Sequence, residues 1–146
     1  MDSFKFPIAL TLIILLIFMH QLSWGKDRKT VRINTCSFQA ELADTMELRQ
    51  QGLSGRKQLA DNAAMLFVFA QNGYHGFWMK DMNFSLDLIW IKEGTIVDIT
   101  ADVPPAVGDE SKWPRYFPKR KADQVLEIKA GTAKKCGMKI GDWVYE

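Results

Sequence analysis

The sequence predicts a mainly β fold, a compact antiparallel β-sandwich or barrel with one or two short helices, behind an N-terminal hydrophobic segment. Three observations predict this class. Apolar or alternating runs of strand length recur from residue 31 to residue 145, and turn residues separate them. Helical signals are confined to residues 45–51 and 131–136. No long helix alternates with the strands, as it would in a parallel sheet.

The N-terminal segment has the features of a targeting signal. Residues 6–19 are 14 uncharged, mainly apolar residues, which cover about 21 Å as a helix, short of the roughly 30 Å hydrocarbon core of a bilayer. Ser23 and Gly25 supply small residues for cleavage after Gly25. We therefore expect residues 1–25 to be a signal peptide, or a membrane anchor formed by residues 6–19. Residues 26–146 would then form a single periplasmic or extracellular domain.

The composition narrows the range of partners. The chain is 47% hydrophobic with a net charge of +2, so it has neither the strong basic excess nor the high pI of a nucleic-acid binder. Membrane contact is expected only through the N-terminal segment if that segment is not cleaved. No phosphate-binding glycine loop, serine elbow or calcium loop occurs in the sequence. We therefore expect no cofactor and no metal, and the catalytic residues, if any, remain unknown.

The two cysteines allow two interpretations. Export would permit a disulfide between Cys36 and Cys136, joining the start of the domain to its end. A loop of that length could stabilise the fold by several kcal/mol. The alternative is two separate buried thiols, because nothing in the sequence fixes the distance between the two Cα atoms. Both interpretations stay open at this point.

The first third of the domain alternates strands with one helix. Residues 31–35 alternate as a half-buried strand, and residues 36–42 continue extended. Asp44 or Thr45 can cap a short helix over residues 45–51, which Gly52 ends. The following ten residues are turn-rich and loop-like.

The middle of the domain contains the strongest strand signals. Residues 65–69 are continuously apolar, which indicates burial on both faces, and residues 71–73 supply a turn. Residues 77–79 are expected to restart the sheet. Residues 86–91 and 96–101 then form a hairpin, the best-defined local pairing in the chain.

A long connection precedes the last elements. Residues 102–121 contain four of the five prolines of the chain, together with a basic run, residues 119–121. That run, with Arg115 nearby, is either a solvated loop or a contact for an anionic surface or ligand. Loops of this length are often functional. Residues 124–129 then form a strand, and residues 143–145 form the final one.

Several motifs together resemble one known family. In order, these are Glu41-Leu42-Ala43, Gly52-Leu53-Ser54-Gly55-Arg56, Met65-Leu66-Phe67-Val68-Phe69, Phe77-Trp78-Met79-Lys80-Asp81-Met82, Leu86-Asp87-Leu88-Ile89, Val125-Leu126-Glu127-Ile128, Gly131-Thr132-Ala133 and Gly141-Asp142. They resemble the DUF192 family of uncharacterised prokaryotic domains, over about residues 38–146. The resemblance implies a compact β-rich sandwich or barrel, frequently exported, and no activity that can be carried over. Ser54 departs from the usual Met, and residues 81–85 depart from the usual Asn-Thr and Ile-Pro.

The Phe-Trp-Met-Lys block is the first candidate for chemistry. In a strand, Trp78 and Lys80 would share one side and Asp81 would lie on the other, with Phe77 and Met79. An aromatic plane beside an ammonium could hold a sugar ring or an anionic group. The alternative is that Trp78 packs in the core while Lys80 pairs with Asp81 or with a carboxylate of the next strand.

Asp87 is the second candidate, because it is the only charged residue in an otherwise apolar strand. A buried carboxylate must find a partner or change its pKa. Arg56 and Lys80 are the expected partners, with Arg56 favoured if the pairing is bidentate. A buried brace between an arginine and Asp87 is favoured over a catalytic carboxylate.

Three hypotheses for function follow. The first is a non-enzymatic extracytoplasmic binding module, in which the loop 102–121 and the Trp78/Lys80 edge line a shallow site for a small polar or glycan-like ligand. Its candidate ligand-binding residues are Arg56, Trp78, Lys80, Asp81, Asp87, Trp113 and Tyr116. The second is a hydrolase that uses Asp87 or Asp98 with His75 or Lys80. The third is a domain that contacts an envelope protein through Trp113, Tyr116 and Phe117.

Overall fold

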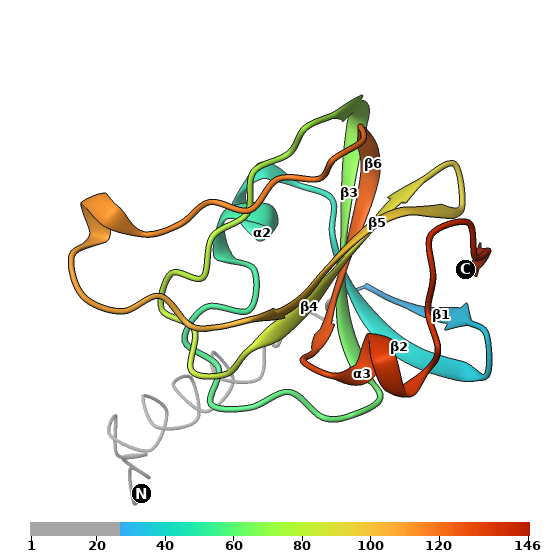
Figure 1. The fold of residues 1–146 in the computed structure, drawn as a ribbon, viewed down its shortest axis with the longest axis horizontal. Coiled ribbons are helices and arrows are strands. Elements are labelled where there is room, and N and C mark those ends of the chain that lie inside the picture. The colour runs from blue at the N-terminus through green and yellow to red at the C-terminus, as the bar shows by residue number, and fades with distance from the viewer. Residues whose placement is uncertain (1–26) are drawn as a thin grey trace, which may run out of the picture.

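Residues 27–146 are described by a computed structural model, in which seven strands form one curled sheet, a half-barrel (Figure 1). The strands are β1 (Arg28–Ile33), β2 (Cys36–Ala43), β3 (Ala63–Gly73), β4 (Leu86–Lys92), β5 (Thr95–Val103), β6 (Ala122–Lys129) and β7 (Val144–Tyr145). Two short helices, α2 (Met46–Gln51) and α3 (Thr132–Lys135), accompany them. The predicted mainly β class with short helices is therefore confirmed. The expected signal peptide or anchor, residues 1–25, lies outside the described residues.

The strand order is β5-β4-β6-β3-β2-β1-β7, and one pairing in it departs from the antiparallel expectation. β2 and β3 pair in parallel, with Ala40 opposite Ala64 and Leu42 opposite Leu66, whereas the other five pairings are antiparallel. The chain makes this parallel connection through α2 and the loop that follows it, which return it to the starting end of the sheet. The sequence indicated α2, capped by Thr45, but not the crossover it makes.

The expected strand 31–35 ends early, at a hairpin turn. Asn34 has a φ of 53°, the left-handed region that asparagine tolerates, and it reverses the chain between β1 and β2. Its side-chain amide donates to the Cys136 and Gly137 carbonyl oxygens and to the Asp142 carboxylate, at 3.3, 3.2 and 2.9 Å. The turn is therefore tied to the chain beyond α3.

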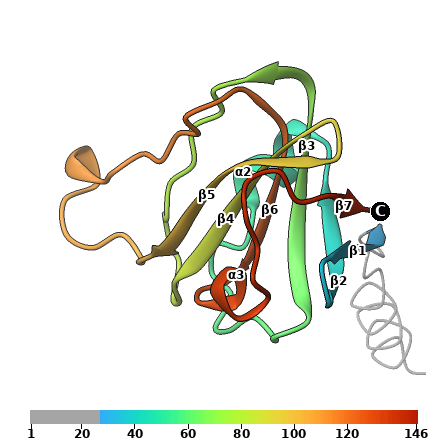
Figure 2. The same cartoon turned by 45° about the vertical axis from the view of Figure 1, so that its right-hand side comes forward.

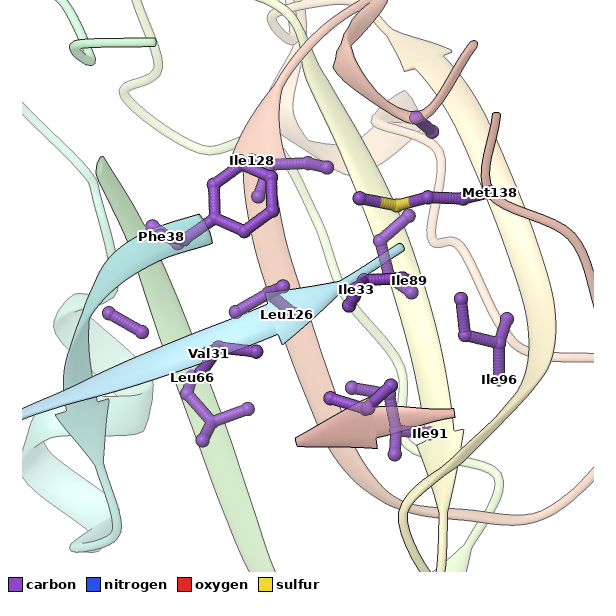
Figure 3. Packing of buried hydrophobic residues seen from close by; sticks show 14 of the residues in the cluster. Val31, Ile33, Phe38, Leu66, Ile89, Ile91, Ile96, Leu126, Ile128 and Met138 are labelled. Carbon is purple, nitrogen blue, oxygen red and sulfur yellow. The ribbon is translucent and has the colours of Figure 1, made fainter. Parts of the chain in front are cut away.

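The first face of the sheet carries an aliphatic core that α3 covers. Its buried residues come from every strand and from the α3 region. Those labelled in Figure 3 are Val31, Ile33, Phe38, Leu66, Ile89, Ile91, Ile96, Leu126, Ile128 and Met138. Cys36 and Cys136 lie against this core and form a disulfide, with 5.9 Å between their Cα atoms. The interpretation as two separate thiols does not hold in this structure.

The second face carries an aromatic core. It contains Phe67, Phe77 and the fully buried Trp90. The Phe77 ring meets the Phe67 ring edge to face at 4.9 Å between ring centres, and it meets the Trp90 ring in the same way at 5.4 Å. α2 and the loop after it cover one part of this face through Leu48 and Leu53. Residues 74–85 cover another part. The space between these two covering segments can hold a site.

Residues 77–79 do not restart the sheet as expected. Phe77 makes one isolated bridge to Tyr116, with N–H···O distances of 2.9 and 2.8 Å, and no ladder continues from it. Burial still alternates, because Phe77 and Met79 are buried and Trp78 is exposed. Asp81 is exposed and has a φ of 53°, so its expected place beside Phe77 and Met79 is wrong.

The long connection forms a strap, defined here as residues 104–121. It contains only a 3₁₀ turn, Glu110–Lys112, and extends well beyond the sheet in both views (Figures 1 and 2). The bridge between Phe77 and Tyr116 holds its middle, and the Asp98 carboxylate accepts the Lys119 backbone N–H at 2.8 Å near its end. None of the helices in the described part of the chain has the length and apolar character needed to cross a membrane.

Candidate functional site

A cavity of about 600 Å³ opens on the second face of the sheet. α2 and the turn after it form one wall, β3 and β6 contribute residues beneath, and the 74–82 segment with Arg115 of the strap forms the other wall. This volume lies within the range of small-molecule sites. Its charged and titratable lining residues are Arg49, His75, Lys80, Arg115 and Glu127.

Glu127 is the unusual member of this lining. It lies in the middle of β6, opposite Met65 of β3 and Leu88 of β4, and only 5% of its surface is exposed. None of residues 27–146 makes a hydrogen bond to its carboxyl. Burial raises its pKa from the ordinary 4.5 to about 8, while the nearby Arg56 guanidinium acts in the opposite direction. At neutral pH the carboxyl is therefore mainly protonated and can both donate and accept a hydrogen bond.

The sequence led us to expect an ion pair between Arg56 and Asp87, but the two residues do not pair. Arg56 has a different partner. It makes a bidentate ion pair with Glu41 of β2, at 2.9 and 2.6 Å. This hydrogen bonding raises the pKa of Arg56 further. Glu41 and Glu127 both lie opposite Met65, on either side of β3, so Arg56 is close to both carboxyl groups but bonded to only one. The pair with Glu41 leaves Glu127 without a counter-ion of its own.

Asp87 is a structural residue on the other face of the sheet. It lies opposite Ile128, and its two oxygens accept the backbone N–H groups of Asp102 and Ala133, each at 2.9 Å. It thereby fixes the start of α3. Neither of its expected partners, Arg56 and Lys80, is bonded to it. The cavity that His75 and Lys80 line is on the opposite face. The hydrolase pairing of Asp87 with either residue is therefore wrong.

Asp98, the other carboxylate in that hypothesis, is also occupied with backbone groups. It accepts the N–H groups of Ile99 and Lys119 at 2.9 and 2.8 Å, and it is 4% exposed. Its position explains how the strap ends at the sheet.

Trp78 holds two cations at the mouth of the cavity. The Arg115 guanidinium lies 4.8 Å from the centre of a Trp78 ring, and the Lys80 ammonium lies 5.3 Å away. Lys80 also pairs with Glu110 of the strap at 3.1 Å, an exposed contact. Trp78 and Lys80 lie side by side, as the sequence indicated, but in a segment that is not a strand. The indole is nevertheless a support for cations here, and neither expected carboxylate partner of Lys80 is bonded to it.

A second aromatic ring holds a cation on the α2 side. The Arg49 guanidinium lies 5.4 Å from the centre of the Phe69 ring, and the His75 imidazole stacks on that ring at 3.6 Å. Arg49 also donates to the carbonyl oxygens of Asp44 and Val68, and His75 Nε2 donates to the Gln71 carbonyl oxygen at 3.1 Å. These bonds fix Arg49 and His75 in place along the cavity wall.

The aromatic residues of the strap have separate positions. Trp113 meets Trp78 edge to face at 6.4 Å, and its buried indole N–H has no hydrogen-bond partner in the described chain. Tyr116 packs against the aromatic core, and Phe117 is 54% exposed and covers Gly76. These three residues therefore do not form one flat exposed patch for a protein partner.

The sequence reasoning missed Glu127, Arg49 and the placement of Arg115 at the cavity. A signal for Glu127 was present, because Val125, Leu126 and Ile128 are all apolar and predict burial on both faces of the strand. A carboxyl within such a run must be buried. No comparable signal identifies Arg49, because its helix is exposed and lies over the cavity only through the parallel crossover.

Comparison with known proteins identifies one matching family and two similar crystal structures. A family model, DUF192 ("Uncharacterized ACR, COG1430"), matches residues 29–145. A crystal structure from Sinorhizobium meliloti 1021, described as a candidate transcription regulator, is similar with 30% identity and a TM-score of 0.75, over 82% of this chain and 94% of that one. A protein of unknown function from Novosphingobium aromaticivorans DSM 12444 is similar with 27% identity and a TM-score of 0.77, over 87% and 90% of the two chains. No curated protein matches this chain.

Proposed function

Because this chain belongs to the DUF192 family, whose description names no activity, we propose a function from the site itself. The domain is a non-enzymatic binding module for a small polar ligand that carries an anionic group, such as an acidic sugar. The ligand occupies the cavity between α2 and the 74–82 segment. The observation that carries this proposal is the charge of the lining, in which Arg49, Lys80 and Arg115 are cations and Glu127 is the only acidic residue among residues 27–146.

The arrangement of the cations supports an anionic ligand. Arg49 lies against the Phe69 ring and Arg115 against the Trp78 ring, so each guanidinium has a defined position before a ligand arrives. Such preorganisation lowers the entropic cost of binding. Guanidinium groups match carboxylate and phosphate oxygens with paired N–H donors.

The place of action is also proposed as outside the cytoplasm. The apolar run over residues 6–19 supports export, with or without cleavage. The disulfide between Cys36 and Cys136 supports it independently, because stable disulfides are typical of oxidising compartments. An extracytoplasmic domain would meet acidic sugars and other small anions from its surroundings.

Calorimetric titration of the full chain at pH 6 tests this function. We expect glucuronate to bind and glucose, its uncharged counterpart, to bind at least tenfold more weakly. Arg115→Ala is expected to weaken glucuronate binding about tenfold, because one charge-assisted hydrogen bond is lost. Arg120→Ala is the matched control, since Arg120 is exposed on the same strap and does not line the cavity.

The proposal fails if glucuronate does not bind at pH 6. It also fails if glucose binds equally well, or if Arg115→Ala and Arg120→Ala weaken binding to the same extent. The thermal midpoint of each variant, measured without ligand, shows whether a loss of binding reflects unfolding.

A further inference from the structure

Resting on this proposed function, we propose that Glu127 binds the ligand as a proton donor, so that the site holds an anion and one proton together. The Glu127 carboxyl donates its O–H to an oxygen of the anion. No covalent bond to the ligand is made or broken. When Glu127 is ionised beforehand, one proton is taken up from the solvent as the ligand binds.

The geometry provides the donor and leaves it unused. Glu127 lines the cavity, is only 5% exposed, and has no hydrogen bond from any part of the chain that the structure describes. The carboxyl oxygens are not among the fully buried polar atoms that lack a partner, so part of their surface faces the cavity, where a ligand can reach them. An oxygen of an anion supplies the acceptor that the protonated carboxyl lacks.

The charges near Glu127 favour its protonated form over its ionised form when an anion is bound. Arg56, which is paired with Glu41, is close enough to act on the Glu127 carboxyl. Arg49 from α2, His75 and Lys80 from the 74–82 segment, and Arg115 from the strap line the same cavity. β3 and β4 present the apolar Met65 and Leu88. Arg56 is neutralised by Glu41, and Lys80 has an exposed ion pair with Glu110, whereas Arg49 and Arg115 have no carboxylate partner in the described part of the chain. An ionised Glu127 would repel that anion, and a protonated one attracts it.

Binding and protonation are therefore coupled in both directions. The anion stabilises the protonated form of Glu127, and protonation of Glu127 strengthens the binding of the anion by the same factor. Because burial places the pKa of Glu127 at about 8, the competent form falls from most of the population at pH 7 to about a tenth at pH 9. The apparent affinity for an anion should fall about tenfold over this interval.

The test is calorimetric titration of the full chain with glucuronate at pH 6, 7, 8 and 9, in buffers of two different ionisation enthalpies. We expect uptake of nearly one proton per bound glucuronate at pH 9 and of almost none at pH 6. The dissociation constant should rise about tenfold between pH 7 and pH 9.

Two variants separate the role of the proton from the role of the side chain. Glu127→Gln carries N–H donors at every pH, so its affinity should change less than threefold between pH 7 and pH 9. Glu127→Met retains the approximate volume without a donor, and it should bind at least tenfold more weakly at pH 6. Lys80 and Arg115 are unchanged in both variants, so any pH dependence that they cause remains visible.

The outcomes distinguish the two proposals. No binding of glucuronate at pH 6 overturns the binding function itself. Binding at pH 6 with no proton uptake at pH 9 overturns the coupling and leaves the binding function standing. An equal pH dependence in wild type and Glu127→Gln also overturns the coupling. Because proton uptake is measured on the wild-type chain, the result holds even if a variant fails to fold.

Discussion

Replacing Glu127 with glutamine is expected to leave the chain about as stable as wild type at pH 4 and several kcal/mol more stable at pH 9. Unfolding exposes Glu127 and returns its pKa from about 8 to its ordinary value of 4.5. Between these values the folded state holds a proton that the unfolded state has lost, so stability falls as pH rises. At about 1.4 kcal/mol per pH unit, the total loss is on the order of 4 to 5 kcal/mol.

Urea unfolding of both chains at pH 4, 6, 8 and 9 measures this difference. The free energy of unfolding of wild type should fall relative to that of Glu127→Gln between pH 4.5 and pH 8 and then level off. Glu110→Gln is the control, because Glu110 is an exposed residue on the strap. A stability difference that does not change with pH would show that Glu127 ionises normally in the folded chain.

Removing the disulfide should have the second large effect. The double variant Cys36→Ala/Cys136→Ala is expected to lose about 4 to 5 kcal/mol of unfolding free energy, because the bridge closes a loop with a sequence separation of 100. The bridge joins the start of β2 to the residue after α3, across the aliphatic core. Cys36 is half-buried and Cys136 is buried, and alanine suits both positions because it introduces no polar group.

Guanidinium unfolding of the wild type with and without reductant, beside the double variant, tests this effect. Reduced wild type and the double variant should unfold at similar denaturant concentrations, both well below the oxidised chain. If all three unfold together, the disulfide does not form in the protein, and one support for an extracytoplasmic location is removed.

Local patterns predicted most of the fold. The hairpin of β4 and β5, the helix capped by Thr45 and the strand of β6 all depend on residues close in sequence, so turn chemistry and periodicity were sufficient. The parallel pairing of β2 with β3 was not predictable in this way. It depends on where a covering helix docks, which is a property of the whole sheet.

The candidate site was harder to predict for a related reason. Trp78 and Lys80 are two residues apart, and their sequence motif placed them together. Arg115 and Arg49 come to the same cavity from distant segments, through the Phe77–Tyr116 bridge and the parallel crossover. The partner of Arg56 was wrongly predicted because Asp87 and Glu41 are equally plausible by charge alone. Only the register shows that Asp87 points to the opposite face.

The most direct test of this account is the NMR titration of the Glu127 side-chain carboxyl carbon from pH 4 to pH 10, with and without glucuronate. The account predicts a midpoint near 8 for the free chain and a higher midpoint with glucuronate bound. A midpoint near 4.5 would show that the carboxyl is already ionised at neutral pH. A midpoint that glucuronate leaves unchanged would show that the anion does not meet Glu127.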